Sequence, residues 1–188
     1  MTRIYVFSLL FFVFAAISYS VLQWHQANNQ PNESFEQNVV PDFIAETLNS
    51  EIFNEFGKLS YIIDADRMEH YAEIEVTHFE YPEYTLYPKN SISPWKISAN
   101  EGTLYNNNRV KLENRVSLKA TDNNSLIQEI HGRYLELDLN TNTISSEQTI
   151  YIKGKGFTMH GSGLIVDLNT KQMILTQHVQ TTYKNSKN

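Results

Sequence analysis

The sequence predicts an all-β domain, and three observations support this class: a repeated turn motif, alternation of apolar and polar residues, and turn-forming residues between the alternating stretches. The tetrapeptide Asp-Leu-Asn-Thr begins at Asp138 and again at Asp167. Each copy lies between alternating stretches, which is typical of strand, tight turn, strand. One such unit is too small to bury its own apolar face, so the copies should stack edge to edge on a shared core.

An uncharged apolar stretch from Ile4 to Leu22 lies near the start of the chain. As a helix rising about 1.5 Å per residue, it just spans a hydrocarbon core of roughly 30 Å. A cleaved signal peptide is the alternative, but Ser18-Tyr19-Ser20 is a poor cleavage site. We therefore expect residues 1–22 to form a transmembrane anchor, with Arg3 and the N-terminus in the cytoplasm and the remainder exported.

Residues 23–41 and residues 42–188 differ in composition. The first range is rich in Asn and Gln, contains Pro31 and Pro41 and lacks an apolar period, so we expect a flexible linker. The second is long enough for one domain with a core. Acidic residues outnumber basic ones, 21 to 15, and Arg3 belongs to the expected anchor. This negative charge argues against a nucleic-acid-binding protein, and the absence of cysteine excludes disulfides and thiolate metal sites.

Alternation with a period of two predicts strands over residues 58–65, 110–119, 144–152 and 173–183. Turn-forming residues separate these stretches, at residues 106–108, 122–124, 140–142 and 169–171. After Leu22 no stretch has a helical period over three turns. The result is an all-β fold of many short antiparallel strands curled around an apolar interior.

Three copies of the unit carry a polar pair at mid-strand: Glu113-Asn114, Glu147-Gln148 and Thr176-Gln177. A polar pair that recurs at this point predicts a bend or bulge where a curved sheet turns a corner. The first two copies are more widely spaced than the last two, and the turn at residues 122–124 can absorb the difference.

Catalytic and metal-binding motifs are weak in this sequence. The six histidines are scattered, and only His78 with Glu80 could share a strand face. Asp64 and Asp66 could mimic a paired-carboxylate site, but they stand at the end of an apolar stretch, where aspartates often begin turns. Asp138 and Asp167 occupy equivalent repeat positions, as turn formers would. We expect no enzyme activity, no cofactor and no metal.

Aromatic residues concentrate between Phe79 and Trp95. They form either an ordinary core or the lining of a curled sheet that stays partly open for acyl chains. Alternation places nine residues on the inner face: Leu59, Tyr61, Phe79, Ile97, Val110, Leu112, Ile150, Met173 and Tyr183.

In its order of motifs the chain resembles the LptC family of lipopolysaccharide export proteins. The resemblance covers nearly the whole chain and rests on the N-terminal apolar stretch and on residues 54–61, 79–82, 94–100 and 135–145, with Tyr183 near the C-terminus. None of these motifs is specific to the family alone, but their order and spacing together are. The family implies a twisted, incompletely closed antiparallel β-jellyroll, or β-taco, after one transmembrane helix.

The resemblance also implies partners. Lipopolysaccharide would come from the inner-membrane ABC transporter formed by LptB, LptF and LptG, and would pass to the periplasmic bridge protein LptA by strand addition at the C-terminal edge. Phe79, Met173, Tyr183 and Leu48 match family positions near the lipid path. Gly57 and Gly154 match glycines whose replacement should disturb the edges that join partners.

Two alternatives stay open at this point. One is a membrane-anchored scaffold that binds proteins through its sheet edges and carries no lipid. The other is a secreted enzyme with an acid pair at Asp64 and Asp66, which would require cleavage after the apolar stretch.

Overall fold

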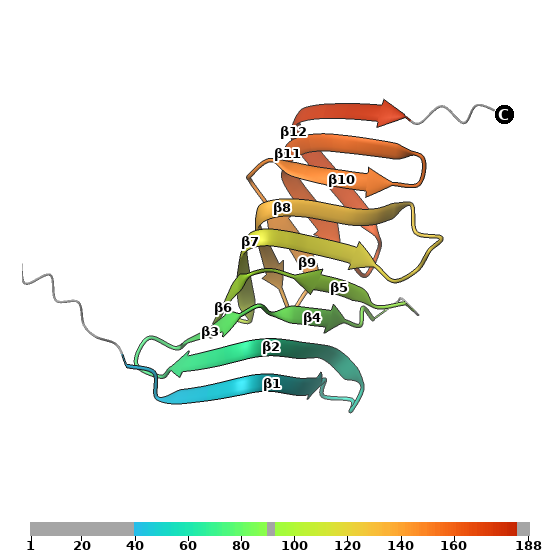
Figure 1. Cartoon of the computed structure of the whole chain (residues 1–188). Helices are drawn as coiled ribbons and strands as arrows, with labels where there is room; N and C mark the ends of the chain where they lie inside the picture. Colours follow the sequence, from blue (N-terminus) through green and yellow to red (C-terminus); the bar gives the residue numbers. More distant parts are fainter. Residues whose placement is uncertain (1–39, 90–92, 184–188) are drawn as a thin grey trace, which may run out of the picture. The chain divides into compact units, whose positions relative to one another are not determined.

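The computed structural model describes residues 40–89 and 93–183, which form one antiparallel sheet of 12 strands and contain no helix (Figure 1). The predicted all-β class is confirmed. Within these residues no helix could span a membrane. The expected anchor, residues 1–22, and nearly all of the expected linker lie outside them. The strands are β1 (Phe43–Phe53), β2 (Leu59–Tyr71), β3 (Val76–Glu80), β4 (Glu83–Leu86), β5 (Trp95–Ser98), β6 (Glu101–Tyr105), β7 (Arg109–Ala120), β8 (Ile127–Asp138), β9 (Thr143–Ser146), β10 (Ile150–Gly154), β11 (Phe157–Asp167) and β12 (Gln172–Tyr183).

The long strands each belong to two half-sheets. One end of β2 pairs with β4 and the other with β3. In the same way the beginning of β7 pairs with β6 and its end with β5, while β8 and β11 both pair with β10 and with β9. We call the half containing β4, β5 and β10 the first half-sheet, and the half containing β3, β6 and β9 the second half-sheet. The two halves meet at a corner that every long strand crosses.

The corner lies where the polar pairs predict it. In β7 the register shifts between Glu113 and Val116, and Asn114 and Arg115 have φ values of 61° and 56°. Residues 147–149 separate β9 from β10, and in β12 the corner lies near His178, whose φ is 52°. A bulge gives one strand an extra residue and increases the local bend, so the sheet folds over without losing its pairing.

One prediction about this corner was wrong. Asp64 and Asp66 do not begin a turn; both lie inside β2, because the strand continues through the corner to Tyr71. Pro82, in contrast, separates β3 from β4, beside Tyr81 with a φ of 50°.

The repeat is confirmed, and the structure explains its unequal spacing. The interval from Asn108 to Asn142 is longer than the interval from Asn142 to Lys171. Residues 121–126 connect β7 to β8, but only residues 155–156 connect β10 to β11. This longer connection supplies most of the difference, and the rest lies in β8, which has 12 residues to the 11 of β11. The turn at residues 122–124 therefore absorbs most of the difference, as predicted.

Candidate functional site

An uninterrupted apolar row runs across the first half-sheet. Directly paired residues share a face of an antiparallel sheet, so the register defines this row. It begins at Ser50 in β1, ends at Thr181 in β12, and between them contains Ile63, Tyr84, Ile97, Leu118, Ile130, Ile152 and Met159. Every member of the row from Ile63 to Ile152 is at most 4% exposed.

The second half-sheet has a matching row on its inner face. It consists of Leu104, Val110, Leu137, Ile144, Val166 and Met173. Both rows belong to one hydrophobic cluster, so they face the same interior. No charged side chain of the described residues is buried, and the interior is therefore an apolar lining.

The predicted inner-face residues occupy three environments. Five are at most 3% exposed within the lining: Phe79, Ile97, Val110, Leu112 and Ile150. Leu48, Tyr61 and Met173 pack against the cluster but are only partly buried. Leu59 lies at a hollow near the β1–β2 turn, and Tyr183 is 75% exposed at the end of β12, with its ring centroid 6.4 Å from that of Phe157. Contact with lipid stays a prediction for all of them.

The aromatic cluster between Phe79 and Trp95 does contribute to the buried interior, through Tyr84 and Trp95. Alternation did not place Tyr84 or Leu86 on the inner face, because Tyr84-Thr85-Leu86 is buried throughout and shows no alternation. The Tyr84 hydroxyl has no hydrogen-bond partner among the described residues, and burial raises the pKa of Tyr84. Cross-strand pairing, with Ile63 and Ile97 on either side of Tyr84, is the signal that identifies it.

A hollow of ≈ 640 Å³ opens where the rims of the two half-sheets approach each other. Leu59 and Tyr87 line it from the first half-sheet, and Leu139 and Asn142 from the second. Beside it the backbone N–H of Lys89 donates to Asn169 Oδ1 at 3.1 Å, which links the two rims directly.

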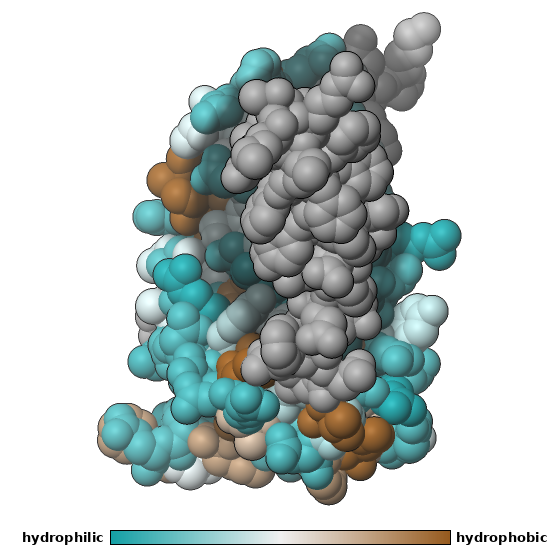
Figure 2. Space-filling view, turned by 90° about the vertical axis from the view of Figure 1, so that its left-hand side faces the viewer, coloured by the Kyte–Doolittle hydropathy of each residue, from teal (hydrophilic) through white to brown (hydrophobic). Residues whose placement is uncertain are grey.

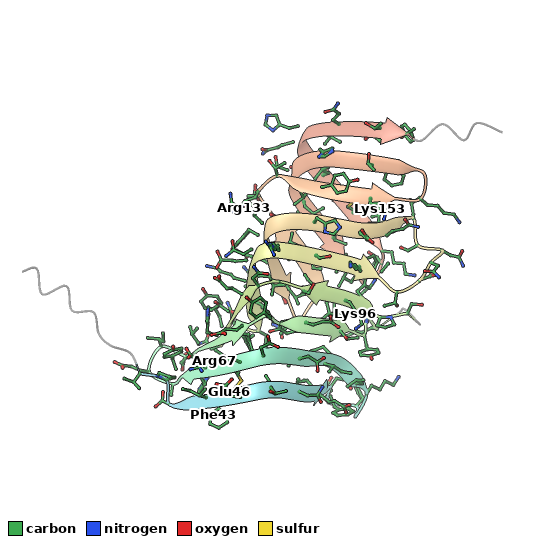
Figure 3. The ribbon with its side chains drawn as sticks, viewed as in Figure 1. Phe43, Glu46, Arg67, Lys96, Arg133 and Lys153 are labelled. Carbon is green, nitrogen blue, oxygen red and sulfur yellow. The ribbon has the colours of Figure 1, made fainter. Side chains whose placement is uncertain are left out.

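Ion pairs occupy the outer faces. Arg67 bonds to Glu46 at 2.8 Å and to Glu69 at 2.7 Å, and Figure 3 shows Arg67 and Glu46 on the neighbouring strands β2 and β1. The Tyr71 hydroxyl and then the Arg67 guanidinium hydrogen-bond to Glu69 and lower its pKa. Exposed pairs of this kind contribute little stability, and they lie outside the apolar lining.

Open sheet edges are the second feature of the site. Among the strands described, only β1 and β12 have a single neighbouring strand, β2 and β11 respectively. Proteins usually protect such edges with lysine, proline or other charged residues. Across its 12 residues β12 has no proline and no Lys, Arg, Asp or Glu, so this edge is free to pair with another strand.

The β1 edge is more apolar at its surface. Phe43, Ile44 and Phe53 in β1 and Phe56 in the following turn are each at least 44% exposed. Figure 2 shows hydrophobic residues gathered at the bottom, the end of the sheet where β1 and β2 lie in Figure 1.

The two predicted interface glycines lie close to these edges. Gly57 has a φ of 69° in the turn that joins β1 to β2. Gly154 ends β10, where an added Cβ would lie 2.1 Å from the ring of Phe157, the residue whose ring lies beside Tyr183. Gly154 is not itself on an edge strand, because β10 lies between β8 and β11.

The candidate chemical groups are not brought together. Asn49 Nδ2 donates to Asp64 at 2.6 Å, and His78 bonds to Thr103 at 3.1 Å. In the described part of the chain no group of three or more His, Cys, Asp or Glu residues could hold a metal ion.

Comparison with known proteins fits this geometry. The family described as "Lipopolysaccharide-assembly, LptC-related" matches residues 8–184. The "Lipopolysaccharide export system protein LptC" of Haemophilus influenzae is 29% identical, over 93% of this chain and 94% of that protein. The protein of the same name from Escherichia coli K12 is 26% identical, over 92% of each chain.

Proposed function

Because the chain belongs to the LptC-related family of lipopolysaccharide-assembly proteins, we propose that it carries lipopolysaccharide between the inner and outer membranes and catalyses no reaction. The observation that carries the proposal is an apolar lining that runs from β2 to β11 and ends beside two unpaired strand edges.

The lining suits the physical problem that this lipid presents. Its acyl chains are costly to expose to water, at about 25 cal/mol per Å² of apolar surface, whereas its sugars and phosphates require water. An apolar interior that opens between two rims shields the chains while the headgroup stays outside. The proposed lipid-contacting residues are Leu48 and the nine inner-face positions: Leu59, Tyr61, Phe79, Ile97, Val110, Leu112, Ile150, Met173 and Tyr183.

The two edges give the path a direction. The β1 edge would receive lipopolysaccharide from the transporter formed by LptB, LptF and LptG, and the β12 edge would pass it to LptA by strand addition. The single neighbour of each strand supports this arrangement. Gly57 and Gly154 would act indirectly, by keeping the β1–β2 turn and the Phe157 ring in place.

The proposed placement in the cell follows from the apolar N-terminal stretch. Residues 1–22 would anchor the chain in the inner membrane, with the N-terminus in the cytoplasm. Residues 23–41 would be the tether, and residues 42–188 the periplasmic domain that holds the lipid.

A photo-crosslinking experiment tests the lipid path. Phe79 is 3% exposed in the lining, whereas Glu113 lies on the outer face of β7. A crosslinker at Phe79 should capture lipopolysaccharide in cells, and one at Glu113 should not. Equal capture at the two positions would overturn the inner-face assignment, and no capture at either would favour a scaffold that carries no lipid.

A further inference from the structure

Asparagine-rich turns stack along one rim of the second half-sheet. The turns at residues 106–108, 139–142 and 168–171 join β6 to β7, β8 to β9 and β11 to β12. Their last residues are Asn108, Asn142 and Lys171, with φ values of 61°, 55° and 59°. The same backbone conformation therefore recurs at each turn, and asparagine is among the residues that adopt it most readily.

Three hydrogen bonds connect the first turn to the second. The Leu139 N–H donates to the Asn108 carbonyl at 3.0 Å. Asn140 Nδ2 donates to the Asn107 carbonyl at 3.1 Å, and Asn108 Nδ2 donates to Asn140 Oδ1 at 3.0 Å. The Asn140 side chain thus both donates and accepts a hydrogen bond between the two turns.

The same three bonds connect the second turn to the third. The Leu168 N–H donates to the Asn142 carbonyl at 3.0 Å. Asn169 Nδ2 donates to the Thr141 carbonyl at 2.7 Å, and Asn142 Nδ2 donates to Asn169 Oδ1 at 3.3 Å. In both cases the earlier turn contributes two backbone carbonyl acceptors and one side-chain amide donor to the hydrogen bonds with the next turn.

We call these stacked hydrogen-bonded turns the asparagine ladder. In its third turn the groups that correspond to those bonded in the earlier turns form no such hydrogen bonds within the described residues. By position, the Thr170 and Lys171 carbonyls correspond to those that accept in the earlier turns, yet no hydrogen bond from the described residues reaches either of them. The Lys171 ammonium is a donor where Asn108 and Asn142 have amides, and it forms no ion pair within the described residues. Both residues are exposed.

We propose that the protein joining at β12 presents a turn of the form Asp-X-Asn that stacks on the third turn as a fourth turn of this ladder. Its asparagine amide donates to the Thr170 carbonyl, and the N–H of residue X donates to the Lys171 carbonyl. The asparagine oxygen accepts from the Lys171 ammonium. This inference rests on the proposed C-terminal joint and adds a recognition element to strand pairing, which alone carries little sequence information.

A second copy of this chain is poorly suited to hydrogen-bond to the third turn. The first turn at the same rim of the second half-sheet, residues 72–75, is Ala-Glu-Ile-Glu and has no side-chain amide. Its only polar side chains are the carboxylates of Glu73 and Glu75, which cannot donate to the Thr170 carbonyl. The ladder therefore favours a different protein over self-association.

Two substitutions at Lys171 test the inference in the full-length protein with the LptA of the same organism. Lys171→Asn restores the residue of the earlier turns and should leave the affinity within about threefold. Lys171→Glu replaces a donor with an acceptor and should weaken binding roughly tenfold. Lys155→Glu, an equal charge change in the exposed β10–β11 turn, should have little effect. Equal weakening by Asn and Glu at position 171, or no change with either, would overturn the ladder.

Crosslinkers at Gln172, the first residue of β12, and at Val179, beyond the corner, separate this inference from the joint on which it depends. Capture of LptA at both Gln172 and Val179, with the Gln172 product mapped by mass spectrometry to an Asp-X-Asn turn, supports both. If LptA is captured but the Gln172 product maps to another kind of segment, the ladder is overturned and β12 is still the joint. Absence of capture at both positions overturns both.

Discussion

The two open edges of the sheet differ in chemistry. β1 and its turn expose the aromatic side chains of Phe43, Phe53 and Phe56, together with the carboxylate of Glu46. β12 exposes mainly uncharged polar residues and begins at a turn with unused hydrogen-bonding groups. The first edge is suited to a joint held by burial of apolar surface, the second to a joint held by directional hydrogen bonds. Each edge can therefore be disabled without the other.

Removal of the β12 edge should have the largest effect. A chain truncated before Met173 loses the strand that LptA is expected to extend, so LptA binding should fall below detection. Binding to the transporter, which we propose occurs at β1, should persist, and in a co-purification it also reports that the truncated protein is folded. Normal LptA binding by the truncated chain would mean that β12 is not the joint.

Gly154→Val should weaken the C-terminal edge selectively. The new side chain collides with the Phe157 ring, which packs beside Tyr183, and overpacking of this kind costs about 1–3 kcal/mol. Denaturant unfolding should show the loss of stability, and LptA binding should weaken more than transporter binding. Equal loss of the two would show that the substitution disturbs the whole sheet.

Gly57→Ala should have a smaller effect, at the opposite edge. A φ of 69° costs a residue with a Cβ about 1 kcal/mol, although the site has room for the atom. Gly156→Ala is the matched control, because Gly156 has a φ of 86° and equally open surroundings in the β10–β11 turn. Both variants should lose similar stability in denaturant, but only Gly57→Ala should weaken transporter binding. The same weakening in both variants would contradict a specific role for the β1–β2 turn.

Acid should weaken the C-terminal joint through Asp167, with the smallest effect. Hydrogen bonds from the Thr170 side chain and then from Asn169 lower the pKa of Asp167 in the last turn. Because its pKa is lowered, ionised Asp167 stabilises the turn at pH values above the ordinary pKa of about 3.9. This stabilisation is lost as the pH falls through the pKa of Asp167 in the folded protein. LptA affinity should therefore decline below about pH 4, and Asp167→Asn should reduce that decline. An identical pH profile for the variant would exclude this contribution.

Much of the fold could be predicted because the last three repeats are regular. Alternation predicted the strands, and the polar pairs that begin at Glu113, Glu147 and Thr176 predicted the corner. The turn-forming residues between the alternating stretches predicted the stacked turns. The path of β2 through the corner was not predictable, since Asp64 and Asp66 resemble turn formers when the chain is read locally. Only pairing with β1, β3 and β4 keeps that strand continuous.

The site was predicted in part for a related reason. Phe79, Ile97 and Leu112 show period-two alternation and are buried as expected. Alternation did not identify Leu86, and Tyr84 was expected in the core or lining only as a member of the aromatic cluster, because every residue from Tyr84 to Leu86 is buried. The asparagine ladder was not predicted because it depends on contacts between turns that lie far apart in the sequence. Asparagines at corresponding positions of the repeat were the available signal, and they were interpreted only as turn formers.

The central claim is that lipid follows the inner face between the two edges, and neighbouring positions 173 and 174 test it most directly. Met173 and Ile174 are both apolar, but Met173 packs against the lining, whereas Ile174 is 56% exposed on the outer face. With transporter, ATP and lipopolysaccharide supplied, a photo-crosslinker at position 173 should capture the lipid and one at position 174 should not. Equal capture at the two positions would show that the lipid follows exposed apolar surface and not the lining, and would contradict the account.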